Sequence, residues 1–171
     1  VKNHLIDDKA MQFIDTAGCG FEEKKDKESL SLYNQGEIDL VTKILEQHIS
    51  VYNDEYSVGI ISPYRQQVER LTDKINSTYD FLPNVKIDTI DSFQGQERDL
   101  IIISLVRSNE NTEIGFLKDY RRLNVALTRA RKKLIVIGDS ATLASDKFYG
   151  QFLDYIDSID AYHSAYEFMY D

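Results

Sequence analysis

The sequence of 171 residues contains one cysteine, Cys19, together with two prolines, three histidines and no tryptophan. A single cysteine cannot form a disulfide framework, and with three scattered histidines it cannot complete a four-ligand zinc site. We therefore expect Cys19 to be a core or loop residue, and we expect no metal site in this chain. No run of about 18 apolar residues is present, and no signal peptide is recognisable. These absences predict a protein of the cytoplasm, or of the nucleus in a eukaryote, with no membrane partner.

The composition shows no bias towards disorder, because 42% of the residues are hydrophobic and 29% are charged, as in ordinary globular domains. Acidic residues outnumber basic ones by 29 to 20, and the net charge of −9 taken alone argues against a nucleic-acid binder. The charge is unevenly distributed, however. Residues 118–133 contain seven basic residues and one acid, whereas residues 139–171 contain one basic residue and seven acids. The basic segment is therefore where we first expect phosphate groups to be recognised.

Short apolar runs alternate with amphipathic stretches along the whole chain. The expected strands are residues 11–15, 57–62, 85–90, 100–106 and 134–138, and the expected helices are residues 34–49, 64–76 and 119–131. Continuous apolar runs are typical of strands that are buried on both faces. Repeated alternation of strand and helix predicts an α/β fold in three layers, with a mostly parallel sheet and helices on both faces. We expect residues 1–171 to form one domain.

The basic segment is expected to be a helix that begins after Asp119, a favourable N-cap residue. Its apolar residues recur at the helical spacing i, i+3, i+4 and i+7 and are Leu123, Ala126, Leu127 and Ala130. Arg122 and Arg129 are seven residues apart, so this helix would place both arginines on one flank.

Two charged segments lie outside the alternating pattern. Residues 21–30 carry charges of both signs and are expected to form a solvated loop. The acidic end, from about residue 146 to residue 171, has apolar residues at helical spacing, namely Phe148, Phe152, Leu153 and Ile156. We expect this C-terminal extension to pack on the domain, and docking of a partner protein is the alternative.

Four segments carry a resemblance to a known family. Residues 91–99 read Asp-Ser-Phe-Gln-Gly-Gln-Glu-Arg-Asp, and residues 121–131 read Arg-Arg-Leu-Asn-Val-Ala-Leu-Thr-Arg-Ala-Arg. They resemble motifs V and VI of superfamily 1 helicases, in the subgroup of the nonsense-mediated decay helicase and related DNA-processing helicases. Residues 60–67, Ile-Ile-Ser-Pro-Tyr-Arg-Gln-Gln, resemble motif IV, and residues 31–37 resemble the segment that precedes it. The resemblance covers residues 11–145.

This resemblance implies the second, C-terminal RecA-like domain of a two-domain motor. In such a motor ATP binds in the cleft between the domains, and nucleic acid lies across both. The sequence has no GxxxxGK[ST] phosphate loop, and Gly18-Cys19-Gly20 lacks the required spacing. We therefore expect an N-terminal RecA-like domain of the same protein to hold most of the ATP and Mg²⁺, and we expect this chain alone to be inactive as an ATPase.

The resemblance also implies roles for individual residues. Arg129 resembles the arginine finger that reaches the γ-phosphate, a catalytic role that requires a forked and permanently charged donor. The residues expected at the nucleotide are Gln35, Gly95, Glu97, Arg122 and Arg129. Close relatives often carry arginine where Gln35 stands, so either Arg65 compensates or the site relies on Arg129 alone. Arg122 is alternatively a solvated charge.

Single-stranded nucleic acid is expected on the loops after the strands. The residues expected there are Ser62, Pro63, Tyr64, Thr89, Asp91 and Ser92. Hydroxyl groups and backbone donors suit phosphate contacts that carry no base information, so we expect no sequence specificity. Tyr64 either stacks on a base or packs in the core.

The function predicted from the sequence is that of a second motor domain of an ATP-dependent DNA or RNA helicase or translocase. It would supply the arginine finger and part of the single-strand surface. The alternative is a stand-alone module that binds single-stranded nucleic acid or a partner protein without ATPase activity.

Overall fold

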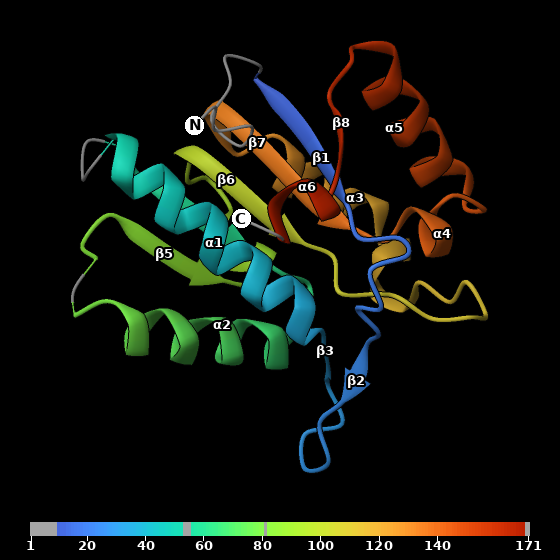
Figure 1. Cartoon of the computed structure of the whole chain (residues 1–171), viewed down its shortest axis with the longest axis horizontal. Coiled ribbons are helices and arrows are strands. Elements are labelled where there is room, and N and C mark those ends of the chain that lie inside the picture. Colours follow the sequence, from blue (N-terminus) through green and yellow to red (C-terminus); the bar gives the residue numbers. More distant parts are fainter. Residues whose placement is uncertain (1–9, 53–55, 81, 170–171) are drawn as a thin grey trace.

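The computed structural model describes residues 10–52, 56–80 and 82–169. Its centre is a six-stranded sheet with the strand order β5-β4-β6-β7-β1-β8 (Figure 1), and every pairing in this sheet is parallel. The strands are β1 (Met11–Asp15), β4 (Val58–Ile61), β5 (Val85–Asp88), β6 (Arg98–Ser104), β7 (Ala130–Gly138) and β8 (Tyr162–Ser164). The five expected strands are therefore neighbours in one sheet, and β8 adds an edge strand that the sequence pattern did not reveal.

Helices connect the parallel strands, and the last helix follows the last strand. They are α1 (Gln35–Tyr52), α2 (Arg65–Thr78), α3 (Tyr120–Leu127), α4 (Ser140–Leu143), α5 (Lys147–Ser158) and α6 (Tyr166–Met169), with the 3₁₀ helices η2 (Ile90–Phe93) and η3 (Gly115–Lys118). Residues 21–30, expected to be a solvated loop, are mostly exposed, but they include β2 (Lys24–Lys25), which pairs with β3 (Leu32–Tyr33) in an antiparallel hairpin. Among the described helices, none is long and apolar enough to cross a membrane.

The hydrophobic core lies on both faces of the sheet. Along β6, Ile101 and Ile103 belong to the cluster on one face, whereas Leu100 and Ile102 belong to the cluster on the other. Each of these side chains is at most 1% exposed, and burial of one such side chain stabilises the fold by about 1.5–3 kcal/mol. Helices α3 and α5 cover the first face, and α1, α2 and α6 cover the second (Figure 1). The prediction of a three-layer, RecA-like α/β fold is confirmed.

The expected helix over residues 119–131 is too long. Asp119 is the N-cap, as predicted, and its carboxylate accepts a hydrogen bond from the Arg122 backbone N–H. The helix ends at Leu127, however, and the Thr128 hydroxyl donates to the carbonyls of the last turn. Ala130 then begins β7 by pairing with Arg98. The apolar spacing alone predicts that the helix continues to residue 131, but pairing with β6 makes residues from Ala130 onwards a strand. Arg122 and Arg129 therefore do not share a helix flank.

The C-terminal extension packs on the sheet. In α5, Ile156 is fully buried in the first core cluster, and Phe148, Phe152 and Leu153 lie partly buried against it. The Asp146 side chain caps this helix by accepting from the Tyr149 N–H. The last strand, β8, pairs with β1 through Phe13, Ile14 and Asp15.

Candidate functional site

A cavity of about 720 Å³ opens at the carboxyl ends of the central strands. Residues 63–65 follow β4 there, residues 89–91 follow β5, and Arg107 lies shortly after β6. Because the strands are parallel, their carboxyl ends meet at one edge of the sheet, where ligands of open α/β folds commonly bind. The loop of the β2–β3 hairpin and the segment from η3 to α3 complete the cavity.

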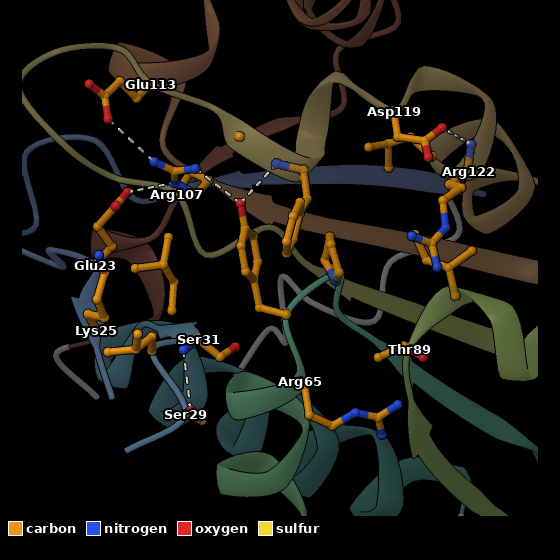
Figure 2. A pocket seen from close by; sticks show the side chains of 18 of the residues that line it. Glu23, Lys25, Ser29, Ser31, Arg65, Thr89, Arg107, Glu113, Asp119 and Arg122 are labelled. Atoms are coloured by element: carbon orange, nitrogen blue, oxygen red, sulfur yellow. Dashed lines mark hydrogen bonds and ion pairs between the residues drawn. The ribbon is translucent and has the colours of Figure 1, made fainter. Parts of the chain in front are cut away.

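Charged side chains surround this cavity. Figure 2 shows Arg107 with Glu23 and Glu113 on one side, Arg122 with Asp119 on the other, and Arg65 near Thr89 between them. The remaining lining residues are Lys25, Ser29, Leu30, Ser31, Leu32, Pro63, Tyr64, Ile90, Asp91, Gly115, Phe116 and Leu123.

The structure brings four of the six residues predicted to contact nucleic acid to this one cavity: Pro63, Tyr64, Thr89 and Asp91. Ser62 is fully buried instead, and its hydroxyl accepts from the Tyr64 N–H at 3.3 Å, which supports the start of α2. The carbonyl of Ser92 accepts from the Lys86 ammonium at 2.6 Å. Neither serine lines the cavity.

Tyr64 forms part of the cavity floor and is only 3% exposed. Its hydroxyl accepts from Arg107 Nη1 at 3.1 Å and from the Phe116 N–H at 3.3 Å, and it lies 3.5 Å from the Ile114 carbonyl. Burial raises the pKa of Tyr64 above its ordinary value, so the phenol stays protonated and can donate to that carbonyl. The Tyr64 ring is stacked on Phe116, with 5.1 Å between ring centroids. Of the two predicted roles of Tyr64, packing is the one seen.

Arg107 is a site residue that the sequence pattern did not reveal. Its guanidinium donates to Glu23 at 3.0 Å, and the two side chains are 8% and 15% exposed. Glu23 also accepts from the Ser108 N–H and the Asn109 side chain, so it joins the hairpin segment to the loop after β6. The position of Arg107 shortly after an apolar strand was the only signal in the sequence that could have indicated a site residue. Its partners could not be predicted, because they are remote in sequence.

Two arginines on the rim are paired with carboxylates. Arg65 donates to Asp88 at 3.3 Å, and its side chain is 60% exposed. Arg122 forms a two-pronged ion pair with Asp91, which places Arg122 in the cavity wall. Burial acts to raise the pKa of Asp88, but hydrogen bonds and Arg65 outweigh it and lower the pKa below its ordinary value. Asp88 is therefore ionised at neutral pH and holds Arg65 as an ion pair.

The residues predicted at the nucleotide separate into two groups. Gly95 and Glu97 precede β6, and Arg129 precedes β7, so these three lie at the amino ends of the strands. The Arg98 N–H donates to the Arg129 carbonyl at 3.0 Å. Gln35 instead begins α1 near the carboxyl end of β6, where it donates to Asp39 at 3.1 Å. Gln35 and Arg122 thus lie at the opposite edge from Arg129.

Arg129 has few interactions of its own. Its Nε atom is buried and has no hydrogen-bond partner among the described residues, and Nη2 lies 3.4 Å from the Thr128 hydroxyl. Arg131, two residues on, pairs with Asp99 at 3.2 Å. Close by, Gly95 has a φ of +73°, a left-handed conformation that favours glycine, and Glu97 is exposed. Arg129 is therefore a cation with unused donors at the edge that carries an exposed carboxylate.

Two segments join these edges of the sheet. Residues 89–97 run from the carboxyl end of β5 to the amino end of β6, and Phe93 packs on the sheet over Gly59. Helix α3 packs beside η2 and runs from the cavity towards Arg129. At the cavity the segments are joined by the Asp91–Arg122 pair, and just beyond their other ends the Arg98 backbone N–H donates to the Arg129 carbonyl.

Phe116 and Gly115 are further lining residues that the sequence analysis missed. Gly115 has a φ of +48°, and a β-carbon there would lie 2.1 Å from Arg107 Nη1. Their importance depends on these tertiary contacts, and no spacing pattern in the sequence indicates it. Across the described ranges, no group of three or more His, Cys, Asp or Glu side chains is placed to hold a metal ion.

Comparison with known proteins gives consistent matches. A family model described as "AAA domain" matches residues 1–141. DNA polymerase alpha-associated DNA helicase A of Saccharomyces cerevisiae is 47% identical over 133 residues, which are 77% of this chain and 19% of the yeast protein. DNA-binding protein SMUBP-2 of Rattus norvegicus is 37% identical over 158 residues, which are 92% of this chain and 16% of the rat protein.

An uncharacterized ATP-dependent helicase of Methanocaldococcus jannaschii is 37% identical over 95% of this chain and 23% of its own length. The chain therefore spans less than a quarter of each of these relatives. Among solved structures, the C-terminal domain of a possible DNA helicase from Lactobacillus plantarum has a similar fold. Its TM-score is 0.54 at 13% identity, over 91% of this chain and 85% of that one.

Proposed function

Because this chain belongs to the AAA domain family, as the C-terminal RecA-like domain of a superfamily 1 helicase, we propose that it is the second motor domain of an ATP-dependent DNA or RNA helicase or translocase. The observation that carries this proposal is the position of Arg129. Its guanidinium has a buried, unpartnered donor among the described residues, and it lies at the same edge of the sheet as Gly95 and Glu97. An anionic group would complete that set of contacts.

The proposed partner is an N-terminal RecA-like domain of the same protein, which would supply the phosphate loop and hold most of the ATP. Mg²⁺ bound there would neutralise charge on the β- and γ-phosphates. Arg129 would donate to the γ-phosphate as negative charge spreads over its oxygens in the transition state. Glu97 would accept hydrogen bonds from the ribose, and Gly95 would let the backbone approach closely.

Single-stranded DNA or RNA would occupy the cavity at the opposite edge. Pro63 and Thr89 offer backbone and hydroxyl groups there, and Arg65 and Arg122 offer guanidinium groups. Contacts of this kind act on phosphate groups and carry no base information. Nucleotide and nucleic acid would thus bind at the two edges that residues 89–97 and α3 connect.

The Arg129→Ala variant of the natural full-length protein tests this assignment. We expect its nucleic-acid-stimulated ATPase rate to fall by about 10³–10⁵-fold, the usual effect of removing an arginine finger, with single-strand binding in the absence of ATP unchanged. Arg131→Ala is the matched control, because Arg131 is paired with Asp99. An Arg129→Ala protein that is folded and retains the wild-type rate would contradict the proposal. If this chain alone also bound single strands as tightly as the full-length protein, the stand-alone module would be the better assignment.

A further inference from the structure

Phe116 presents a large aromatic ring to the cavity. Its side chain is 66% exposed, although it lies in η3, a turn whose next residue, Leu117, is fully buried. The Leu117 carbonyl accepts from the Tyr149 hydroxyl at 2.6 Å, so the turn is anchored from below. Phe116 therefore cannot turn inwards without displacing Leu117 from the core.

One face of the Phe116 ring is covered and the other is open. The covered face rests on Tyr64, with 5.1 Å between centroids and 24° between ring planes. The Phe116 backbone N–H also donates to the Tyr64 hydroxyl at 3.3 Å, which fixes the turn relative to the ring below it. The remaining face points away from Tyr64 into the cavity that both rings line.

Tyr64 is held in place by hydrogen-bonded side chains. Arg107 donates to the Tyr64 hydroxyl at 3.1 Å and is itself held by Glu23 at 3.0 Å. Arg107 packs closely against the Gly115 backbone, since a β-carbon added at Gly115 would lie 2.1 Å from Arg107 Nη1. Arg107 thus holds the hydroxyl end of Tyr64, Phe116 is stacked on the Tyr64 ring, and of the three residues only Phe116 is exposed.

Exposed cationic side chains lie around the open face, and two of them, Arg65 and Arg122, are paired with Asp88 and Asp91. Lys25, Arg65 and Arg122 line the same cavity, and the latter two stand on different sides of it (Figure 2). Flat aromatic rings stack on any nucleobase, and nearby cations contact its phosphate groups. A base paired within a duplex has no free face to offer, which favours an unpaired strand.

We propose that the open face of Phe116 is a stacking platform for one base of a single strand, with Tyr64 and Arg107 as its fixed support. This inference rests on the proposed function, since it places the strand in the same cavity. The platform adds affinity without base preference, because every base has a π face.

The test measures binding of a fluorescent single-stranded oligonucleotide to the full-length protein by anisotropy. We expect Phe116→Ala to weaken binding about tenfold, whereas Phe116→Tyr keeps the wild-type affinity. Phe116→Leu is the matched control for mere hydrophobic contact. It should weaken binding as much as alanine does, and wild-type affinity in the leucine variant would overturn the stacking proposal.

A second measurement uses oligonucleotides that carry one abasic site at successive positions. The wild-type protein should lose affinity for one of these strands, and Phe116→Ala should bind that strand and the intact strand equally. Equal losses in both proteins would overturn the platform. If the wild-type protein binds no single strand, the proposed function fails as well. If it binds and its ATPase depends on Arg129, while Phe116→Ala binds like wild type, only the platform fails.

Discussion

Glu37 is a fully buried carboxyl group between α1 and β6. Its Oε1 atom accepts from the Ser104 hydroxyl at 2.7 Å and from the Val106 N–H at 3.1 Å, whereas Oε2 has no partner among the described residues. Burial raises the pKa of Glu37 from 4.5 to about 7. The bond to Val106 also holds a β-branched residue at a φ of +72°, which is a strained conformation.

This raised pKa predicts a pH-dependent stability. Below about pH 4.5 Glu37 is protonated in both states, and as the pH rises towards 7 it ionises in the unfolded chain first. The free energy of unfolding of the wild-type protein should therefore fall with rising pH, relative to that of the Glu37→Gln variant. The fall should be at most about 1.4 kcal/mol per pH unit in this window. Urea unfolding of both proteins between about pH 4 and pH 8 measures the difference. A difference that does not change with pH would show that Glu37 is not the titrating group.

Gly115 tests how strictly Arg107 is positioned. Gly115→Ala places a side chain at a positive φ, which costs about 1–2 kcal/mol, and it adds a clash with the guanidinium. We expect the free energy of unfolding to fall by more than in Gly20→Ala. Gly20 has a φ of +75°, but a β-carbon added there would have no atom within 4 Å, so this variant reports the backbone cost alone. Equal losses in the two variants would mean that Arg107 simply moves aside.

At the scale of elements, α3 is short and depends on its cap. Asp119→Ala removes the acceptor for the Arg122 N–H and should lower the free energy of unfolding by about 1 kcal/mol. Asp119→Asn keeps a side-chain oxygen and should lose only a few tenths of that amount. Thermal or urea unfolding of the three proteins provides the comparison, and equal losses in both variants would exclude the cap as the cause.

The main elements could be predicted because their apolar patterns are long. The strands β4, β6 and β7 are buried on both faces, and their continuous apolar runs in the sequence predict this burial. The end of α3 could not be predicted, since Ala126, Leu127 and Ala130 continue the helical spacing while pairing with β6 decides the strand. β8 has three residues and β2 two, too few for a pattern.

The candidate site was predictable to the same degree. Pro63, Thr89 and Asp91 follow strands of a parallel sheet, so their sequence positions suffice to bring them together. Arg107 and Phe116 became part of the site only through contacts with Glu23 and Tyr64, which are remote in sequence. Gln35 was assigned to the nucleotide by resemblance alone, and the structure places it at the other edge from Arg129.

At the scale of the whole molecule, the net charge of −9 conceals a rim whose arginines are already neutralised. A phosphate group that bound there would have to compete with a carboxylate for each of them. Asp91→Asn should strengthen single-strand binding roughly two- to fivefold by releasing Arg122, and the affinity should depend more steeply on salt. Asp157→Asn, on the exposed side of α5, makes the same change in net charge and should have no effect. Weaker binding by Asp91→Asn would identify Asp91 as a direct contact.

Residues 89–97 and α3 link the two edges of the sheet. The Asp91–Arg122 pair links the segments at the cavity, and at their other ends both lead into the sheet, where the Arg98 backbone N–H donates to the Arg129 carbonyl. Gly59 lets Phe93 pack close against the strands. In the proposed motor, a strand bound at Arg122 would therefore contact a helix whose far end leads directly to Arg129.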